Sequence, residues 1–444
     1  MTKLVLIGAG STMFAKDIVG DLLLKDDVLV DEMALVDINT TKLDLSRRLY
    51  EKMIEQSGKK IKVTATTDRR EVLPGAKYVV ECIAIGGPQA AHNDVLIPDK
   101  YGVNQNLGDS LGPGGAFRTL RVAPEIIKIA KDMEELCPDA LLFQHANPMC
   151  AINIPLDWSS GIQHYGICHS VQGTVEHMSN YLGVPVEKID YWVAGINHMA
   201  WFLKLEVDGI DQYPKLFEIA KDKERIAKFA DMERGYKAMG AHLVDYVRFE
   251  ALEKFRYFVT ESPFHFSEYT PYFRKNEQMI KDYEVEDRWW HRHEDNAVKY
   301  YEDAKRLVET SEPVVHTKSH HYVPDLVESL ETGRTFFSNL NVPNDGLILN
   351  LPDDCIVEVP CFSDRLGIHP CAVGKLPEQL AGLNRTNVNF QLCLAHAIVE
   401  KKKDYIYDAI RLDPLTSAQL TLNQIDKMVD ELMEANAKWV ADYK

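Results

Sequence analysis

The chain begins with a short apolar strand, a glycine-containing turn and a helix, and this arrangement constrains the fold more than any other part of the sequence. Lys3-Leu4-Val5-Leu6-Ile7 is followed by Gly8-Ala9-Gly10-Ser11-Thr12, after which residues 14–24 have helical periodicity. Gly8 permits a tight turn, Gly10 lets the backbone approach a pyrophosphate, and the first amides of the helix can bind it. The third glycine of the dinucleotide fingerprint is missing, so the turn alone is weak evidence for a nucleotide.

A second strand supports the same interpretation. Met33-Ala34-Leu35-Val36 ends at Asp37, whose carboxylate can accept hydrogen bonds from both ribose hydroxyls of NAD. An acid here disfavours the 2′-phosphate of NADP, because two anions would be placed in contact. The alternative is a coincidental turn followed by a solvated acid. The predicted NAD-binding residues are Gly8, Gly10, Ser11, Thr12 and Asp37.

Strands and helices alternate up to about residue 200, which predicts an α/β fold with a Rossmann-type parallel sheet. Later segments, around 215–256 and 275–310, are helical and lack that alternation. At 444 residues the chain is too long for one ordinary core. We therefore expect an NAD-binding Rossmann domain at residues 1–198 and a C-terminal α+β domain, for substrate binding and oligomerisation, at residues 199–444.

Several connecting and late segments carry specific expectations. Residues 106–118 are polar and glycine-rich, which is typical of a loop over an active site and also of an ordinary connector. Asn147 precedes Pro148 after a strand, so its amide would project from the strand tip. Residues 356–360 are predicted to form an edge strand, because Pro360 cannot donate to a ladder. The apolar spacing over residues 422–433 predicts a helix that faces the core or a dimer partner.

A thiol and an imidazole each follow a strand-like run. Cys168 comes after Tyr165-Gly166-Ile167, and His198 comes after residues 189–195. Open α/β sheets bind ligands at the carboxyl ends of their strands, so Cys168 and His198 are candidate metal ligands. The alternative is a buried core thiol and a hydrogen-bonded surface imidazole. Tyr269, in a polar and aromatic loop at 265–273, is by itself most simply a packed surface aromatic.

Charge and composition exclude several classes of partner. The 67 acidic and 50 basic residues give a net charge of −17, which would repel nucleic acid and anionic lipid surfaces. No apolar run approaches the length of a membrane span, and the first residues lead directly into a strand without a secretory signal. The eight cysteines contain no Cys-x-x-Cys pair, so reduced thiols are expected. We therefore expect a cytoplasmic protein without nucleic-acid or membrane partners.

Taken together, the motifs resemble the NAD- and manganese-dependent glycoside hydrolases of family 4, with most similarity to the α-galactosidases of the melibiase type. The resemblance covers nearly the whole chain. It rests on the nucleotide turn and Asp37, on Asn147-Pro148-Met149, Cys168-His169-Ser170-Val171 and Gly195-Ile196-Asn197-His198-Met199, on the tyrosine segment at 265–273, and on Leu111-Gly112-Pro113-Gly114-Gly115 and Asn344-Asp345-Gly346-Leu347-Ile348. Any one of these motifs alone would not be specific.

The resemblance implies a lactate and malate dehydrogenase-like fold, NAD as a catalytic cofactor that is not consumed, and Mn²⁺ held by Cys168, His198 and two sugar oxygens. A thiolate suits manganese poorly, so the choice of metal would reflect availability and the oxygen-rich remainder of the shell. Oxidation at C3 would acidify the C2 proton, which Tyr269 would remove as the base before the aglycone is eliminated, water adds and the ketone is reduced. Asn147 would contact the substrate ring or the nicotinamide ribose, and Asp109 and Arg118 are further candidate substrate contacts.

The residue after the metal cysteine departs from part of the family. Phosphosugar-cleaving members tend to have an acid or asparagine there, whereas this chain has His169, which could serve as the leaving-group acid or as a structural histidine. Because no clear arginine pair is available for a phosphate, we expect an unphosphorylated sugar. Arg118, Arg288 and Arg292 leave a uronic acid substrate open. The leading hypothesis is an α-galactosidase, and the alternatives are an α-glucuronidase or α-galacturonidase, a simple NAD-linked dehydrogenase and a non-catalytic NAD-binding regulator. A homodimer or homotetramer is expected.

Overall fold

Six parallel strands form one half of the sheet in the computed structural model, which describes residues 2–11, 14–230, 243–286, 289–319 and 321–444, with the backbone alone for 289–295. They lie in the order β3-β2-β1-β4-β5-β6, the strand order of the Rossmann fold. Strands β1, β2 and β4 are buried along nearly their whole length, as central strands of parallel sheets are, whereas β3 lies at the edge of the sheet and is partly exposed. The predicted Rossmann-type sheet is thus confirmed. The strands are β1 (Lys3–Ile7), β2 (Glu32–Val36), β3 (Lys62–Thr66), β4 (Tyr78–Glu81), β5 (Leu141–Gln144) and β6 (His164–Gly166).

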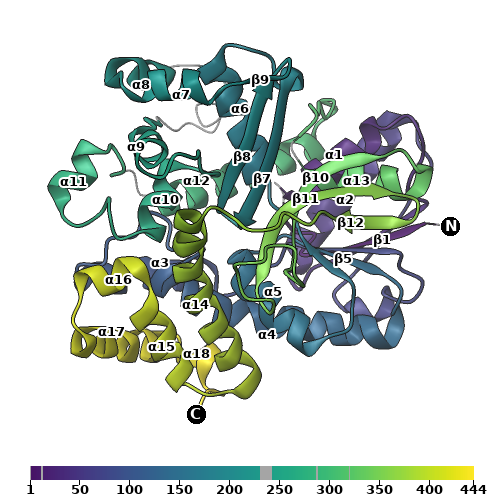
Figure 1. Ribbon diagram of the computed structural model, residues 1–444. Coiled ribbons are helices and arrows are strands. Elements are labelled where there is room, and N and C mark those ends of the chain that lie inside the picture. Colours follow the sequence, from purple (N-terminus) through teal and green to yellow (C-terminus); the bar gives the residue numbers. More distant parts are fainter. Residues whose placement is uncertain (1, 12–13, 231–242, 287–288, 320) are drawn as a thin grey trace.

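Helices cover the parallel strands in two groups (Figure 1). Helix α1 contacts α2, whereas α4 contacts both α3 and α5. Local signals set the ends of α2, where the side chain of Asn39 accepts a hydrogen bond from the amide of Lys42, and Gly58 closes the helix in the left-handed conformation. The helices are α1 (Phe14–Leu24), α2 (Thr40–Ser57), α3 (Gly87–Lys100), α4 (Gly112–Leu136), α5 (Met149–Ser159) and α6 (Ser170–Leu182), with short 3₁₀ turns at Arg69–Glu71 and Val186–Lys188.

The sheet continues beyond β6 with antiparallel strands, in the order β10-β11-β7-β8-β9. Strand β10 bridges to β6 at Asn341 and Gly166, and β11 bridges to β7 at Glu358 and Gly195. The two strands from residues 336–364 therefore lie between β6 and β7 of the earlier chain, and one sheet joins the two predicted units. The domain boundary at residue 198 stays a prediction. The strands are β7 (Ile189–Ile196), β8 (Met199–Val207), β9 (Ile210–Asp211), β10 (Phe336–Pro343), β11 (Ile356–Asp364) and β12 (Gly367–Pro370).

Strand β11 is central, so the predicted edge strand at 356–360 is wrong. It pairs with β10 along its length, and Asn339 lies opposite Pro360. The amide of Cys371 donates to the carbonyl of Pro360, so the missing N–H of this proline faces the same side as its carbonyl. On that side the pairing with β7 is at Glu358 and the pairing with β12 begins at Cys361. The proline therefore lies between two partners, where no ladder donor is lost.

Of the remaining helices, α13 contacts β10 and β11, α14 contacts α5, and α7 to α11 lie beside β8 (Figure 1). Helix α17 buries Ile425, Met428, Val429 and Leu432 and contacts α3 and α15, so the predicted amphipathic helix faces the core. The central helices are α7 (Tyr213–Ala220), α8 (Lys223–Phe229), α9 (Tyr246–Phe255), α10 (Pro263–Tyr269), α11 (Glu277–Asp282), α12 (Trp289–Glu309) and α13 (Tyr322–Thr332). The C-terminal helices are α14 (Glu378–Glu400), α15 (Asp404–Leu412), α16 (Pro414–Gln419), α17 (Leu422–Ala435) and α18 (Ala437–Val440).

Two segments predicted as loops are partly helical. Helix α4 begins at Gly112, inside the predicted loop 106–118, with Pro113 in its first turn. A Cβ on Gly114 would lie 2.4 Å from the carbonyl oxygen of Gly108, so glycine lets the helix contact the preceding loop. The tyrosine segment forms helix α10, because Ser262 caps the amide of His265. The glycines of 106–118 and the aromatic residues of 265–273 thus reflect close packing rather than open loops.

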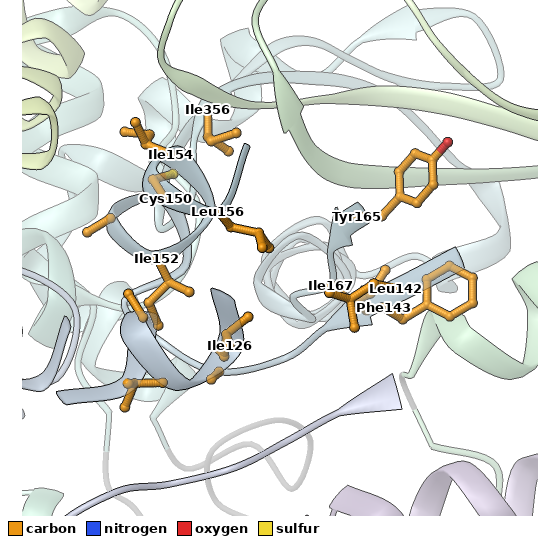
Figure 2. Close-up of a cluster of buried hydrophobic side chains, with 14 of the residues drawn as sticks. Ile126, Leu142, Phe143, Cys150, Ile152, Ile154, Leu156, Tyr165, Ile167 and Ile356 are labelled. Carbon is orange, nitrogen blue, oxygen red and sulfur yellow. The ribbon is translucent and has the colours of Figure 1, made fainter. Parts of the chain in front are cut away.

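Apolar side chains fill the space between the sheet and its helices. Figure 2 shows part of this core, where Leu142 and Phe143 of β5 and Tyr165 of β6 lie near side chains of α4, α5 and β11. All eight cysteines are described, and each is a free thiol, as expected. Among the helices of the described residues, none is long and apolar enough to span a bilayer.

Candidate active site

The turn after β1 has the geometry of a nucleotide-binding turn. Gly8 has φ +88°, and a Cβ at this position would lie 2.9 Å from the carbonyl of Cys82. The amides of Gly8 and Ala9 donate to the carbonyl of Val36, and the amide of Ser11 donates to the carbonyl of Gly8. The conformation therefore requires glycine at position 8. Thr12 lies outside the described residues.

Asp37 joins this turn to the end of β2. Its Oδ2 accepts a hydrogen bond of 2.8 Å from the amide of Gly10, and its Oδ1 accepts one of 2.8 Å from the amide of Asn39. A Cβ on Gly10 would lie 2.6 Å from Asp37 Oδ2, so glycine is needed at this position too. The half-buried carboxylate keeps lone pairs for further donors. A glycine cradle beside an acid at the next strand end fits the pyrophosphate and the ribose diol of NAD.

Cys168 and His198 come together on neighbouring parts of the sheet. Cys168 follows β6, and His198 occupies the turn between β7 and β8 with φ +62°. The Cys168 Sγ lies 3.3 Å from His198 Nε2, and both residues are buried. Burial alone would raise the pKa of the thiol and lower that of the imidazole, but their attraction lowers the pKa of Cys168 and raises that of His198. The pair is therefore suited to hold a thiolate.

A thiolate and an imidazole are metal ligands, and this pair fits a partly protein-bound metal. The described residues contain no group of three or more histidine, cysteine, aspartate or glutamate side chains placed to hold an ion. Cys168 and His198 would thus supply two ligands, and the other positions would be filled by water or by oxygens of a bound molecule. The metal role of Cys168 and His198 stays a prediction.

The second ring nitrogen of His198 connects this pair to Tyr269. His198 Nδ1 lies 3.1 Å from the Tyr269 hydroxyl and 3.3 Å from Ser110 Oγ, and Ser110 Oγ in turn donates to Asp109 Oδ1 at 3.0 Å. Tyr269 is 1% exposed, so it is not a surface aromatic. Burial, and then the carboxylate of Asp109, raise the pKa of Tyr269 well above its usual range. The predicted residues Asp109, Tyr269, Cys168 and His198 therefore form one connected group.

Sequence reasoning missed a histidine and an acid in this group. His265 Nδ1 forms an ion pair with the carboxylate of Glu261, and its ring lies against His198 with centroids 4.7 Å apart. The Nε2 atom is 3.8 Å from Asp109 Oδ1. Burial lowers the pKa of His265, but Glu261 more than reverses this effect and raises it. Helical spacing supplied a signal, because His265 and Tyr269 are four residues apart on one face of α10.

A second missed acid lies behind the cysteine. Glu358 is fully buried in the centre of β11, and burial, followed by Cys168, raises the pKa of its carboxyl well above its usual range. The signal in the sequence was an acid inside the apolar run Ile356–Pro360, which is costly unless the residue is used.

Other predicted residues lie at the margin of the group. His169 is exposed, with its ring 6.3 Å from Phe14 and 6.0 Å from His321. The side chain of Asn147 turns back to the amide of Met149, and its carbonyl accepts a 2.9 Å hydrogen bond from Arg118 Nε. Arg118 therefore stabilises the strand tip. Arg288 and the side chain of Arg292 lie outside the described residues.

A cavity of about 430 Å³ lies against β8 and is bordered by Tyr213, Phe217 and Arg256. It contains none of the predicted site residues.

The strand order and the glycine turn define a Rossmann-type α/β protein, and the predicted site residues Asp37, Cys168 and His198 follow the carboxyl ends of its strands. Comparison with known proteins gives the family. The model of the family 4 glycosyl hydrolases matches residues 3–184, and the model of the family 4 glycosyl hydrolase C-terminal domain matches residues 193–416. The chain belongs to family 4 of the glycosyl hydrolases and is a glycosidase.

Similar proteins match along the full length. An alpha-galactosidase of Bacillus subtilis (strain 168) is 39% identical, and the match covers 100% of both chains. An alpha-galactosidase of Rhizobium meliloti (strain 1021) is 33% identical over 99% of this chain and 89% of its own length. A 6-phospho-alpha-glucosidase from gut microorganisms, solved in complex with NAD and Mn²⁺, is 19% identical with a TM-score of 0.81, over 99% of this chain and 98% of that one, and shows the same fold.

Proposed function

We propose that the protein hydrolyses α-galactosides with two cofactors, NAD and a divalent metal. The metal that we propose is Mn²⁺. The observation that carries the proposal is the double engagement of His198, which contacts Cys168 through one ring nitrogen and Tyr269 through the other. An ordinary hydroxy-acid dehydrogenase has no use for a thiolate-bound metal. The substrate class is supported by the two full-length relatives described as alpha-galactosidases.

The residues that would hold the cofactors are those whose geometry fits them. Gly8, Gly10, Ser11 and Asp37 would bind NAD, and Cys168 and His198 would bind the metal. When bound, NAD supplies a reversible acceptor for oxidation at the sugar C3, and the metal supplies a Lewis acid for the sugar oxygens. The C2 proton becomes acidic only after that oxidation, because the ketone then stabilises the neighbouring carbanion.

Tyr269 is the proposed base for the C2 proton. Its hydroxyl is buried and directed at His198, and burial keeps it neutral in the absence of a nearby cation. Positive charge held by Cys168 and His198 would favour the phenolate form, because an opposite charge within a few ångströms stabilises the ionised group. Asp109 Oδ1 and His265 Nε2 lie 3.8 Å apart and would offer an acceptor and a donor for sugar hydroxyls.

His169 is the proposed acid for the leaving group. Its ring is exposed next to Cys168 in sequence, so it can exchange protons with solvent between turnovers. The competing role is structural, supported by its ring contacts with Phe14 and His321. Replacing His169 with glutamine separates the two roles. An acid role predicts a larger loss with alkyl than with activated aryl galactosides, whereas a structural role predicts equal losses.

Hydrolysis in deuterated water tests the proposed route. An aryl α-galactoside is incubated with the protein, NAD and Mn²⁺ under reducing conditions, and the released sugar is analysed by NMR. Deuterium at C2 without net formation of NADH supports oxidation and elimination, because the proton removed by Tyr269 exchanges before it can return. Galactose released without label at C2 would contradict the proposal.

Parallel assays test the substrate. Aryl α-glucuronide and aryl α-galacturonide differ from the galactoside at C6, where a carboxylate would need a cationic partner. We expect the galactoside to have the highest kcat/KM, since Arg118 is bonded to the carbonyl of Asn147. A higher kcat/KM for either uronide would assign the protein to that class while leaving the cofactor chemistry unchanged.

A further inference from the structure

Three consecutive backbone amides converge on one buried carboxylate outside the groups assigned above. The amides of Asn106 and Leu107 donate to Glu268 Oε1, the second at 2.7 Å, and the amide of Gly108 donates to Oε2 at 3.3 Å. Glu268 is 3% exposed. A buried carboxylate that accepts several amides is a strong local anchor, because each bond is charge-assisted and shielded from water.

The two sides of this anchor carry different parts of the site. The loop of Asn106 to Gly108 continues directly into Asp109 and Ser110, and Ser110 Oγ lies 3.3 Å from His198 Nδ1. Glu268 itself immediately precedes Tyr269 at the end of α10. One side chain therefore fixes the distance between a loop and a helix end that are about 160 residues apart in the chain.

Arg274 partly compensates the buried charge of this carboxylate. Burial raises the pKa of Glu268, and the guanidinium of Arg274 is the main opposing influence. Arg274 is bound on the same loop, since its Nε donates to the carbonyl of Asn104 at 2.9 Å. The other side of the loop is tied separately, because Gln105 Nε2 donates to the carbonyl of Leu111 at 3.0 Å. A change at Glu268 should therefore loosen one side of the loop without unfolding it.

We propose that Glu268 is a positioning residue, which holds the loop of Asn106 to Gly108 so that Asp109 and Ser110 lie against His198 and Tyr269. The Glu268 side chain is bonded to the loop amides and acts on the site through Asp109 and Ser110. The turnover readout of this proposal rests on the proposed function, whereas the anchoring itself does not.

Hydrogen–deuterium exchange of the full-length protein tests the anchor without any substrate. Glu268→Gln keeps one accepting oxygen but turns an NH₂ group towards the amide of Gly108, so one amide of the peptide spanning 104–110 should lose protection. Glu268→Ala should expose all three. The matched control is Glu134→Gln, which removes a carboxylate that accepts the amide of Gly161 far from the site. Unchanged exchange in Glu268→Ala would overturn the proposal.

A double-mutant cycle tests the positioning role. Glu268→Gln should lower kcat for an aryl α-galactoside at least tenfold while NADH binding, followed by fluorescence, changes less than twofold. In an Asp109→Ala, Ser110→Ala background the same substitution should cost less than threefold, because both side chains that it positions are already absent. If the fold-losses in kcat of the separate variants multiply in the combined variant, Glu268 has a merely structural role and the proposal is overturned. If the native protein cleaves no galactoside, the proposed function fails, and the exchange result still decides whether Glu268 anchors the loop.

Discussion

At the scale of single residues, His198 accounts for most of the geometry of the site. Its φ of +62° lies in the left-handed region, which costs a non-glycine residue about 1–2 kcal/mol. This conformation lets one imidazole reach Cys168 on one side and Tyr269 on the other. A strained residue with two site partners is what a functional constraint on the backbone predicts.

Replacement of Cys168 by serine should abolish hydrolysis while NAD still binds. A serine hydroxyl stays protonated at neutral pH and is a poor ligand, so we expect activity to fall about 100-fold or more, as losses of metal ligation do. The turnover of an aryl α-galactoside and the fluorescence titration of NADH measure the two effects. Cys393→Ser, in the half-buried α14 position, is the control and should keep its activity. Full activity of Cys168→Ser would contradict the proposed role of Cys168 as a metal ligand.

Replacement of Asp37 by asparagine should weaken NADH binding about tenfold, because hydrogen bonds to a charged acceptor contribute roughly 1.5–3 kcal/mol and asparagine keeps only part of this. A fluorescence titration gives the dissociation constant. The matched control is Asp68→Asn, an exposed acid just after the neighbouring strand β3, which should leave the affinity unchanged. An unchanged affinity in Asp37→Asn would show that this carboxylate only supports the turn through Gly10.

At the scale of elements, the contact between helix α4 and its preceding loop depends on glycine. A Cβ on Gly114 would lie 2.4 Å from the carbonyl oxygen of Gly108 and 2.7 Å from that of Asp94. Backbone atoms cannot move aside as a flexible side chain can. The loop held by Glu268 on one side is therefore pressed against the first turn of α4 on the other.

Gly114→Ala should separate these two elements. We expect a loss of about 1–3 kcal/mol in the free energy of unfolding, as for overpacked sites, together with a fall in kcat as Asp109 and Ser110 move. Urea unfolding and steady-state kinetics measure both. Gly382→Ala in α14, where nothing lies within 4 Å, is the control and should stabilise the protein by about 0.5–1 kcal/mol. Equal stability of the two variants would contradict the packing account.

At the scale of the whole molecule, Glu81 couples the stability of the sheet to pH. It is fully buried at the end of β4, between β1 and β5, and burial raises its pKa to about 8. The unfolded chain loses this proton near pH 4.3, whereas the folded chain retains it until about pH 8. The folded state therefore binds more protons in this window, and the contribution of Glu81 to stability falls as pH rises through it.

Glu81→Gln removes this dependence. The unfolding free energy of the variant, relative to the native protein, should increase between pH 5 and pH 8 by on the order of 4 kcal/mol, because each pKa unit corresponds to about 1.4 kcal/mol. Urea titrations at several pH values test it. Glu134→Gln should show no such change, since the pKa of Glu134 is lowered to about 2 and its titration lies outside the window. A constant difference in unfolding free energy between Glu81→Gln and the native protein would contradict the assignment.

The homodimer or homotetramer and the cytoplasmic location stay predictions. Size-exclusion chromatography with light scattering would decide the oligomeric state.

The sequence by itself determined the fold class and most of the chemically important residue types. Gly8, Gly10 and Asp37 follow strands that hydrophobic periodicity predicts. Their place at adjacent strand ends therefore follows from the local sequence. The positions of Cys168 and His198 could be predicted for the same reason, since each follows a strand. The resemblance supplied their partner Tyr269, because periodicity had given no reason to bring it there.

Only the tertiary structure decided which side chains meet. The sheet inserts β10 and β11 between β6 and β7, which places Glu358 near Cys168 and makes β11 central, and no local pattern records that order. The amides held by Glu268 depend on long-range packing of α10 against the loop before α4, and the contact of the His265 ring with His198 joins α10 to the turn between β7 and β8. Local sequence sets secondary structure through short-range sterics and hydrogen bonds, whereas contacts across 160 residues depend on how whole elements share the core.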